Sequence, residues 1–140
     1  MITAPKLTLA DARLVVDGAE AKAREIGADM DIAVVDDGGH LLAFIRMDGA
    51  RVTSIDVAIN KAFTAACARR GTHEYAKIAG PAGPAFGMHT TNHGRFMIVG
   101  GGLPIFAQGS IVGGVGCSSG SPEQDQEVAQ AGIDRLLASL

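Results

Sequence analysis

The chain has 140 residues, of which 47% are hydrophobic but only 4% aromatic, and it carries a net charge of −3. This length predicts a single domain, residues 1–140, whose aliphatic core buries about two-thirds of the unfolded surface. Both signs of charge are interspersed, so there is no basic stripe to bind nucleic acid. No apolar run approaches the ~20 residues needed to span a membrane.

The N-terminal residues predict a helix from Thr8 to about Gly27 rather than a secretory signal. Thr8 is a good N-cap residue, Asp11 follows at the spacing of a weak capping box, and Gly27 is a typical helix stop. Apolar residues recur at three- and four-residue steps between them and give one buried face. Because no charged region precedes an uninterrupted apolar run, we expect a cytoplasmic protein in which Cys67 and Cys117 are free thiols.

Residues 31–47 predict a β-hairpin. Two apolar runs, residues 32–35 and 41–47, flank the turn residues Asp36-Asp37-Gly38-Gly39. These residue types tolerate the positive φ angles that a tight turn requires.

Two helices are predicted next. The first starts at Thr53 or Ser54 and runs to about Arg70, and the second is short, from Thr72 to Ala79. The longer helix has a flat face of alanines, which lets it approach a sheet or another helix closely. Because such a face buries little area per residue, we also expect it to contact a flat surface of a second copy in a homo-oligomer.

The last third of the chain predicts three strands and a helix. The strands are residues 95–99, 103–107 and 110–116, with a turn at Gln108-Gly109 between the last two. Residues 121–124, Ser-Pro-Glu-Gln, begin a final helix with a capping box and proline in its first position. The order of elements predicts an α+β fold in which five strands form one antiparallel sheet covered by helices.

Two segments carry a resemblance to a known family. DIAVVDDGGHLLAFIRMDGA, residues 31–50, and GGGLPIFAQGSIVGGVGCSSGSPEQDQEVAQAGI, residues 100–133, resemble the GlcG/HbpS-like family, which includes haem-binding proteins and the C-terminal domain of PduO-type proteins. The resemblance covers nearly the whole chain. It implies a profilin-like, three-layer fold with a five-stranded sheet, haem or a related planar ligand, and a homo-oligomer that is a dimer or an assembly of dimers such as an octamer.

The candidate ligand site lies in residues 80–94, which predict a long irregular loop with at most one helical turn. His89 and His93 are four residues apart, a spacing that on a helix would place both imidazoles on one face for a metal ion or a haem iron. Phe86 and Met88 offer apolar lining for a flat ligand. The alternative is a polar loop that happens to contain two histidines.

A second charged cluster follows the hairpin. Arg46 and Arg51 flank Asp48, and a guanidinium group suits the carboxylate of a substrate. The alternative is a structural Arg–Asp pair that fixes the end of the strand to the next helix. His40 and His73 are expected to be surface residues.

Three further features offer weaker candidates. Gly100-Gly101-Gly102 is explained better by backbone geometry than by phosphate binding. Cys117 lies near a helix start that would lower the pKa of its thiol and make it a nucleophile, whereas Cys67 is expected to be packed and inert. Glu123 and Asp125 suit the start of the last helix, with an acid/base pair as the alternative.

The sequence leaves three functions open. The first is a small binding protein that holds haem through His89 and His93 as a sensor, carrier or accessory factor. The second is an enzyme acting on a small oxo- or hydroxy-acid, with Arg46 or Arg51 holding a carboxylate and a loop histidine moving a proton. The third is a structural or assembly subunit.

Overall fold

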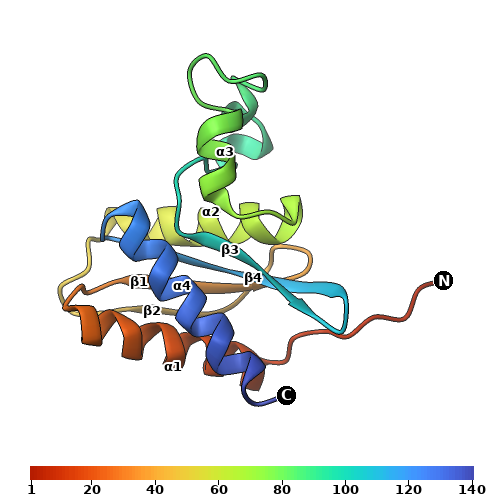
Figure 1. Cartoon of the computed structure of the whole chain (residues 1–140), viewed down its shortest axis with the longest axis vertical. Coiled ribbons are helices and arrows are strands. Elements are labelled where there is room, and N and C mark those ends of the chain that lie inside the picture. The colour runs from red at the N-terminus through yellow and green to blue at the C-terminus, as the bar shows by residue number, and fades with distance from the viewer.

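The computed structural model describes residues 1–140 as an antiparallel sheet with helices on both faces (Figure 1). The elements in chain order are α1 Leu9–Ile26, β1 Asp31–Asp36, β2 Leu41–Arg46, α2 Thr53–Ala68, α3 Thr72–Ile78, the short 3₁₀ helices η1 Met88–Thr90 and η2 Asn92–Gly94, β3 Gly102–Ala107, β4 Ser110–Ser118 and α4 Pro122–Leu137. The α+β class and the antiparallel sheet are therefore confirmed.

The two terminal helices begin where their capping residues predict. In α1 the Thr8 hydroxyl accepts from the Asp11 N–H while the Asp11 carboxylate accepts from the Thr8 N–H, and Gly27 ends the helix with φ of 69°. In α4 the same reciprocal pair is formed by Ser121 and Gln124. Both helices therefore enter the fold with their first N–H groups satisfied.

The sheet has four strands in the order β2-β1-β4-β3, and every neighbouring pair is antiparallel. Both predicted hairpins are confirmed, and the turn between β3 and β4 uses Gln108 and Gly109 at φ of 52° and 75°. The expected fifth strand, residues 95–99, is wrong. Its backbone bonds to α2 instead, because the Thr64 hydroxyl donates to the Arg95 carbonyl and accepts from the Met97 N–H.

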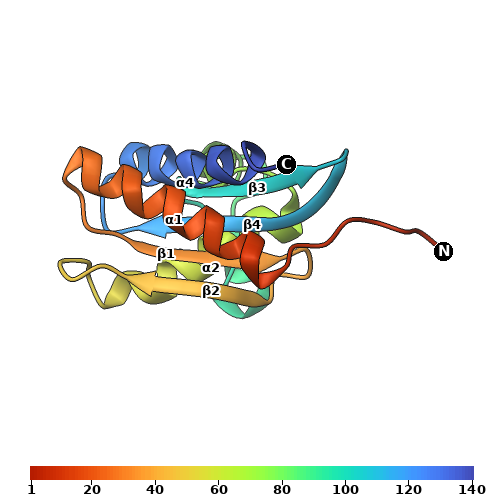
Figure 2. The same cartoon turned by 90° about the horizontal axis from the view of Figure 1, so that it is seen from below.

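Helices cover the sheet unequally. Figure 2 views the face on which α1 and α4 pack side by side, and these two helices enclose the main cluster of 18 buried apolar residues with that face. The opposite face is covered by α2, with a smaller buried cluster. No helix is both long and apolar enough to cross a membrane.

The contact between α2 and β4 depends on small residues on both sides. A Cβ atom added at Gly114 would lie 2.6 Å from the Ala62 carbonyl oxygen, and one added at Gly116 would lie 2.5 Å from the Ala62 nitrogen. The alanine face of α2, which includes the fully buried Ala58 and Ala62, is thus used against the chain's own sheet. The expectation that this face contacts a second copy is therefore wrong.

The start of α2 also differs from the prediction. Val52 occupies the N-cap position without a side-chain hydrogen bond, and Ser54, a predicted capping residue, is buried in the helix. The first N–H groups find other acceptors, because Ser54 N–H donates to the Arg51 carbonyl and Ile55 N–H to the Val52 carbonyl. A tight backbone turn therefore replaces the side-chain cap.

Candidate functional site

The predicted ligand loop belongs to a projection that we call the arm, residues 72–95, which contains α3, η1 and η2. Figure 1 shows that the arm lies on the side of α2 that faces away from the sheet and projects outward from it. It is closed by local bonds, such as Ala85 N–H to the Ile78 carbonyl at 2.9 Å. Its prolines and glycines prevent a longer helix, so the prediction of an irregular segment is confirmed.

The two predicted ligands in the arm, His89 and His93, do not share a helical face, and the arm also contains His73 in α3. His89 lies in η1 and His93 in η2, and Thr91, between them, is extended at φ of −81° and ψ of 172°. His93 itself has the left-handed φ of 58°, a conformation that is uncommon outside glycine. The helical argument for their spacing is therefore wrong, although both imidazoles remain in the arm.

Both imidazoles are free of hydrogen bonds. No side-chain atom of His89 or His93 takes part in any hydrogen bond in the chain, and the Nδ1 atom of His89 is buried without a partner. The ring of His89 lies 5.5 Å from the ring of Phe86. Phe86 is 63% exposed and Met88 37% exposed, so exposed apolar side chains adjoin an imidazole that makes no hydrogen bond.

A cavity of about 290 Å³ lies between α2 and the arm. Its lining is mostly apolar, and its side chains include Phe63, Cys67, Tyr75, Met88, Asn92 and Phe96. The rings of Tyr75 and Phe96 meet edge to face at 4.8 Å, which fixes one wall. Of the four residues predicted to hold the ligand, only Met88 lines this cavity.

Two arginines lie over the aromatic walls of this cavity. The Arg95 guanidinium is 3.7 Å from the centroid of Phe63, and the Arg70 guanidinium is 5.7 Å from the centroid of Tyr75. Arg70 also approaches Glu74 at 3.9 Å, whereas Arg95 forms no ion pair. Neither guanidinium is itself part of the lining, but each lies over a ring that is, and the charge of Arg95 acts on Cys67 in the lining.

The alternative site near Arg46 and Arg51 has no cavity of this kind. Neither arginine lines the α2–arm cavity, a neighbouring cavity of about 350 Å³ between α3 and α4, or the 780 Å³ groove between α1 and α4. Neither pairs with Asp48. The loop is fixed instead by Gly49 N–H donating to Asp29 and by Arg51 N–H donating to the hydroxyl of Ser119.

Asp31, close to Arg46 and Arg51, is a buried charged residue that the sequence analysis did not single out. Its side chain is fully buried, opposite Arg46 across the β1–β2 pair, and neither carboxylate oxygen has a hydrogen-bond partner. Burial raises the pKa of Asp31, and the charges of Arg46 and Arg51 offset this rise only in part. The carboxylate therefore costs folding free energy when it is ionised.

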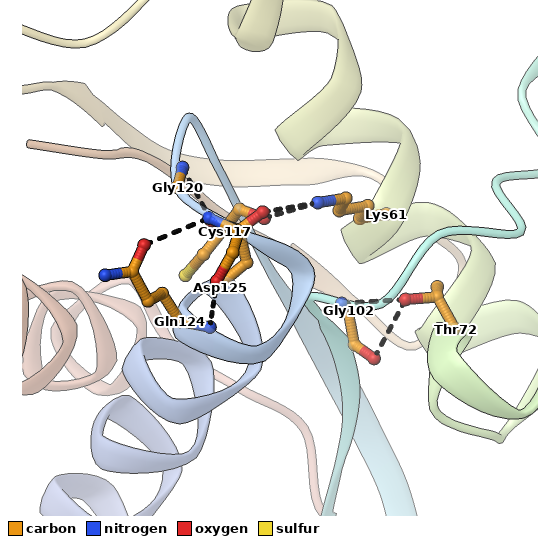
Figure 3. Close-up of polar contacts among 8 residues, drawn as sticks. Lys61, Thr72, Gly102, Cys117, Gly120, Gln124 and Asp125 are labelled. Atoms are coloured by element: carbon orange, nitrogen blue, oxygen red, sulfur yellow. Dashed lines mark hydrogen bonds and ion pairs between the residues drawn. The ribbon is translucent and has the colours of Figure 1, made fainter. Parts of the chain in front are cut away.

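A buried ion pair joins α2 to α4 (Figure 3). The Lys61 ammonium, from α2, donates to Asp125 of α4 at 2.9 Å and to the Cys117 carbonyl at 3.0 Å, and both charged side chains are 2% exposed. Asp125 also accepts from the Gly120 N–H. Burial nevertheless raises the pKa of Asp125, with Lys61 the main opposing influence.

This pair was missed by the sequence reading, which assigned Asp125 with Glu123 to helix-start chemistry or an acid/base pair. Asp125 is buried, so it does not serve as one half of an exposed pair with Glu123. The available signal was Lys61 itself, which lies on the buried stripe of α2 with Ala58, Ala62 and Ala65. A charged residue on such a stripe requires a buried partner.

Both cysteines are free thiols, as predicted, but their environments are reversed. Cys117 is fully buried, and this burial raises the pKa of its thiol far above the ordinary range, so the expected nucleophile is wrong. Cys67, expected to be packed, is exposed and lines the cavity of the arm. Partial burial also raises the pKa of Cys67.

No group of three or more His, Cys, Asp or Glu side chains is placed to hold a metal ion. A structural zinc ion takes four protein ligands and a catalytic one takes three. The arm therefore does not resemble a site for a bare metal ion, whereas one or two imidazoles match the axial ligands of an iron whose other ligands come from a cofactor.

Comparisons with known proteins agree with this architecture. The family described as "Haem degrading protein HbpS-like" matches residues 7–134. A 15.0 kDa protein from the dhaT-dhaS intergenic region of Citrobacter freundii is 44% identical over 128 residues, which cover 91% of this chain and 90% of that protein.

Two solved structures are similar over nearly their full length. Protein ORFY of Klebsiella pneumoniae superposes with a TM-score of 0.95 at 39% identity, covering 99% of this chain and 95% of that one. A complex of PduOC with haem superposes with a TM-score of 0.89 at 29% identity, covering 94% of this chain and 95% of that one.

Proposed function

The chain belongs to the HbpS-like family, and on that premise we propose that it binds haem or a related planar ligand on the arm. The observation that carries the proposal is the imidazole of His89, which makes no hydrogen bond and lies 5.5 Å from the ring of the exposed Phe86. His73, whose Nδ1 atom is also buried without a partner, pairs with no aromatic ring. The haem complex of the similar PduOC structure supports the choice of ligand.

The residues of the arm fit such a group. Haem, when bound, would supply a redox-active iron, and His89 or His93 would hold it. His89 and His93 provide nitrogen ligands that make no competing hydrogen bonds, and Phe86 and Met88 provide apolar surface for a flat ring. His89 is the stronger candidate, because its ring already rests against that of Phe86.

The same geometry favours binding over catalysis on a small acid. Arg46 and Arg51, the residues proposed to hold a substrate carboxylate, lie beside Asp31 and line none of the three cavities described above. The arm has no carboxylate hydrogen-bonded to an imidazole that would orient a general base. We therefore propose a role as sensor, carrier or accessory factor.

We also propose that the protein is a homo-oligomer. The alanine face of α2 is occupied by β4, so contacts between copies would use other apolar surface, which includes Phe86, Leu41 and Val52 at 63%, 50% and 65% exposure. Light scattering at micromolar concentration is expected to give a dimer or a multiple of dimers, and a monomer would refute this proposal.

Titration with haemin, followed by visible absorption, tests the proposed function. The wild-type protein is expected to shift and sharpen the Soret band at a defined stoichiometry. The His89→Ala/His93→Ala variant is expected to lose this shift while keeping its far-UV circular dichroism. The control is His40→Ala, which removes a histidine outside the arm and should bind as the wild type does. Binding that survives loss of both His89 and His93 would refute the site.

A further inference from the structure

We propose that the cavity between α2 and the arm binds an aromatic carboxylate, with Arg95 as the residue that holds the carboxylate. The walls of the cavity are the rings of Phe63, Tyr75 and Phe96, which suit an apolar planar body. Its volume of about 290 Å³ suits a ligand of one or two rings and is too small to enclose a tetrapyrrole.

Arg95 is held in place but has no anionic partner. Its guanidinium lies 3.7 Å from the centroid of Phe63, and its side chain is only partly exposed. No carboxylate lies within ion-pair distance of it, and the only hydrogen bond of Arg95 beyond its own turn uses its carbonyl oxygen, which accepts from Thr64. A stacked guanidinium whose N–H groups are free is a preformed site for a planar carboxylate.

Arg95 differs in this respect from the second arginine of the cavity. Arg70 lies over Tyr75 but approaches Glu74 at 3.9 Å, so part of its charge is already neutralised. Arg95 is therefore the anchor, and Arg70 adds a weaker, longer-range attraction. The two arginines lie over different rings of the lining, Arg95 over Phe63 and Arg70 over Tyr75.

Positive charge predominates in the segment beside the cavity, while two carboxylates outside that segment, Asp36 and Asp37, also act on Cys67 in the lining. Acidic residues outnumber Lys and Arg by 15 to 12 in the whole chain, but the segment 69–95 contains Arg69, Arg70, Lys77 and Arg95 against the single acid Glu74. Local excess of positive charge raises the local concentration of anions and disfavours cationic ligands. An aromatic amine would meet this charge without any carboxylate in the lining to balance it.

Two sources share this chemistry. One is a small free aromatic acid that enters the cavity, and the other is a carboxylate substituent of a larger planar group such as a porphyrin. For the second source the inference rests on the proposed haem function, whereas for the first it stands on the cavity and Arg95 alone. The two are separated by using benzoate and metal-free protoporphyrin IX as probes.

Isothermal titration calorimetry with benzoate tests the first source. Benzoate is expected to bind the wild-type protein, and the neutral isostere benzamide about tenfold more weakly, because a charge-assisted hydrogen bond is lost. Arg95→Ala should weaken benzoate binding by about tenfold, and Arg95→Lys by less, because it keeps the charge but not the fork. Arg46→Ala, an exposed arginine outside the arm, is the matched control and should have no effect.

Protoporphyrin absorption tests the second source. Its binding should weaken in Arg95→Ala and persist in His89→Ala/His93→Ala, because no iron is present to be coordinated. Lack of benzoate binding at millimolar concentration would overturn the inference, and so would equal benzoate affinities in wild type and Arg95→Ala. Neither result would count against the proposed haem binding, which haemin titration tests separately. Benzoate binding that depends on Arg95 in a protein that does not bind haemin would refute the haem function alone. Circular dichroism checks that both Arg95 variants are folded.

Discussion

The buried Lys61–Asp125 pair leads to the prediction that removing one partner destabilises the fold more than removing both. At their separation of 2.9 Å, two unit charges attract by about 6 kcal/mol at an effective dielectric constant of about 20. Withdrawal of each ion from water costs several kcal/mol, so the intact pair contributes little net stability. A partner left alone keeps its desolvation cost and loses the attraction.

The variants separate these contributions. Lys61→Met leaves the Asp125 carboxylate with only the Gly120 N–H, and we expect a loss of about 3–5 kcal/mol in the free energy of unfolding. The double variant Lys61→Met/Asp125→Asn has no buried charge. We expect it to lie only about 1–2 kcal/mol below the wild type, the cost of leaving the Cys117 carbonyl without its donor.

The pH dependence of the free energy of unfolding provides an independent test of this reasoning. Burial already raises the pKa of Asp125 above its ordinary value, and loss of Lys61 removes the main opposing charge, so this pKa rises further. When the pKa of a carboxyl group is higher in the folded than in the unfolded state, its ionised form destabilises the fold. For Asp125 this destabilisation is present above the folded-state pKa and is lost as the pH falls through that pKa. Lys61→Met should therefore be closer to wild type at about pH 5 than at about pH 8.

Urea unfolding measures these effects. It is followed by far-UV circular dichroism rather than by fluorescence, because the chain has no Trp and only one Tyr. The protein concentration has to be fixed across variants, since association would add to the apparent stability. Lys61→Met within about 1 kcal/mol of wild type, or a double variant destabilised by the sum of the two single changes, would refute the reasoning.

Three other predictions follow from single positions. Gly116→Ala should destabilise by about 3 kcal/mol, because its Cβ would lie 2.5 Å from a backbone nitrogen of α2, whereas Gly100→Ala meets nothing closer than 3.4 Å and should be nearly neutral in the same urea assay. Asp31→Asn should stabilise by about 1–2 kcal/mol at neutral pH, because it removes a buried carboxylate without partners. Since burial raises the pKa of Asp31 in the fold, this gain should shrink as the pH falls through that raised pKa, and thermal unfolding that shows a gain growing toward acid would contradict it. Ellman's reagent should modify one thiol in the native chain and two after unfolding, and native labelling that survives Cys67→Ser would show that Cys117 is accessible.

Local signals in the sequence predicted most of the fold correctly. The capping boxes at Thr8 and Ser121 and the turn residues around Gly39 and Gly109 act within a few residues of themselves, so their geometry follows from the sequence. The expected strand at residues 95–99 failed because its continuous apolar run, Phe-Met-Ile-Val, matches a strand, while its hydrogen-bond partner is a threonine 31 residues earlier in α2. Nothing within that segment distinguishes the two partners.

The candidate site was predicted only in part for the same reason. The composition of the arm marked His89, Met88 and Phe86 as neighbours, since they are close in sequence. The cavity wall from α2, with Phe63 stacked under Arg95, depends on how the arm folds over a helix that precedes it. The partner of Lys61 was equally hidden, because Asp125 lies 64 residues further along the chain.

Crystals grown with haemin, with anomalous scattering recorded at the iron absorption edge, test the central claim most directly. The account predicts an iron peak beside the imidazole of His89 or His93, with the ring against Phe86 and Met88. An iron peak in the α1–α4 groove or beside Arg46, with His89 and His93 both unligated, would contradict it.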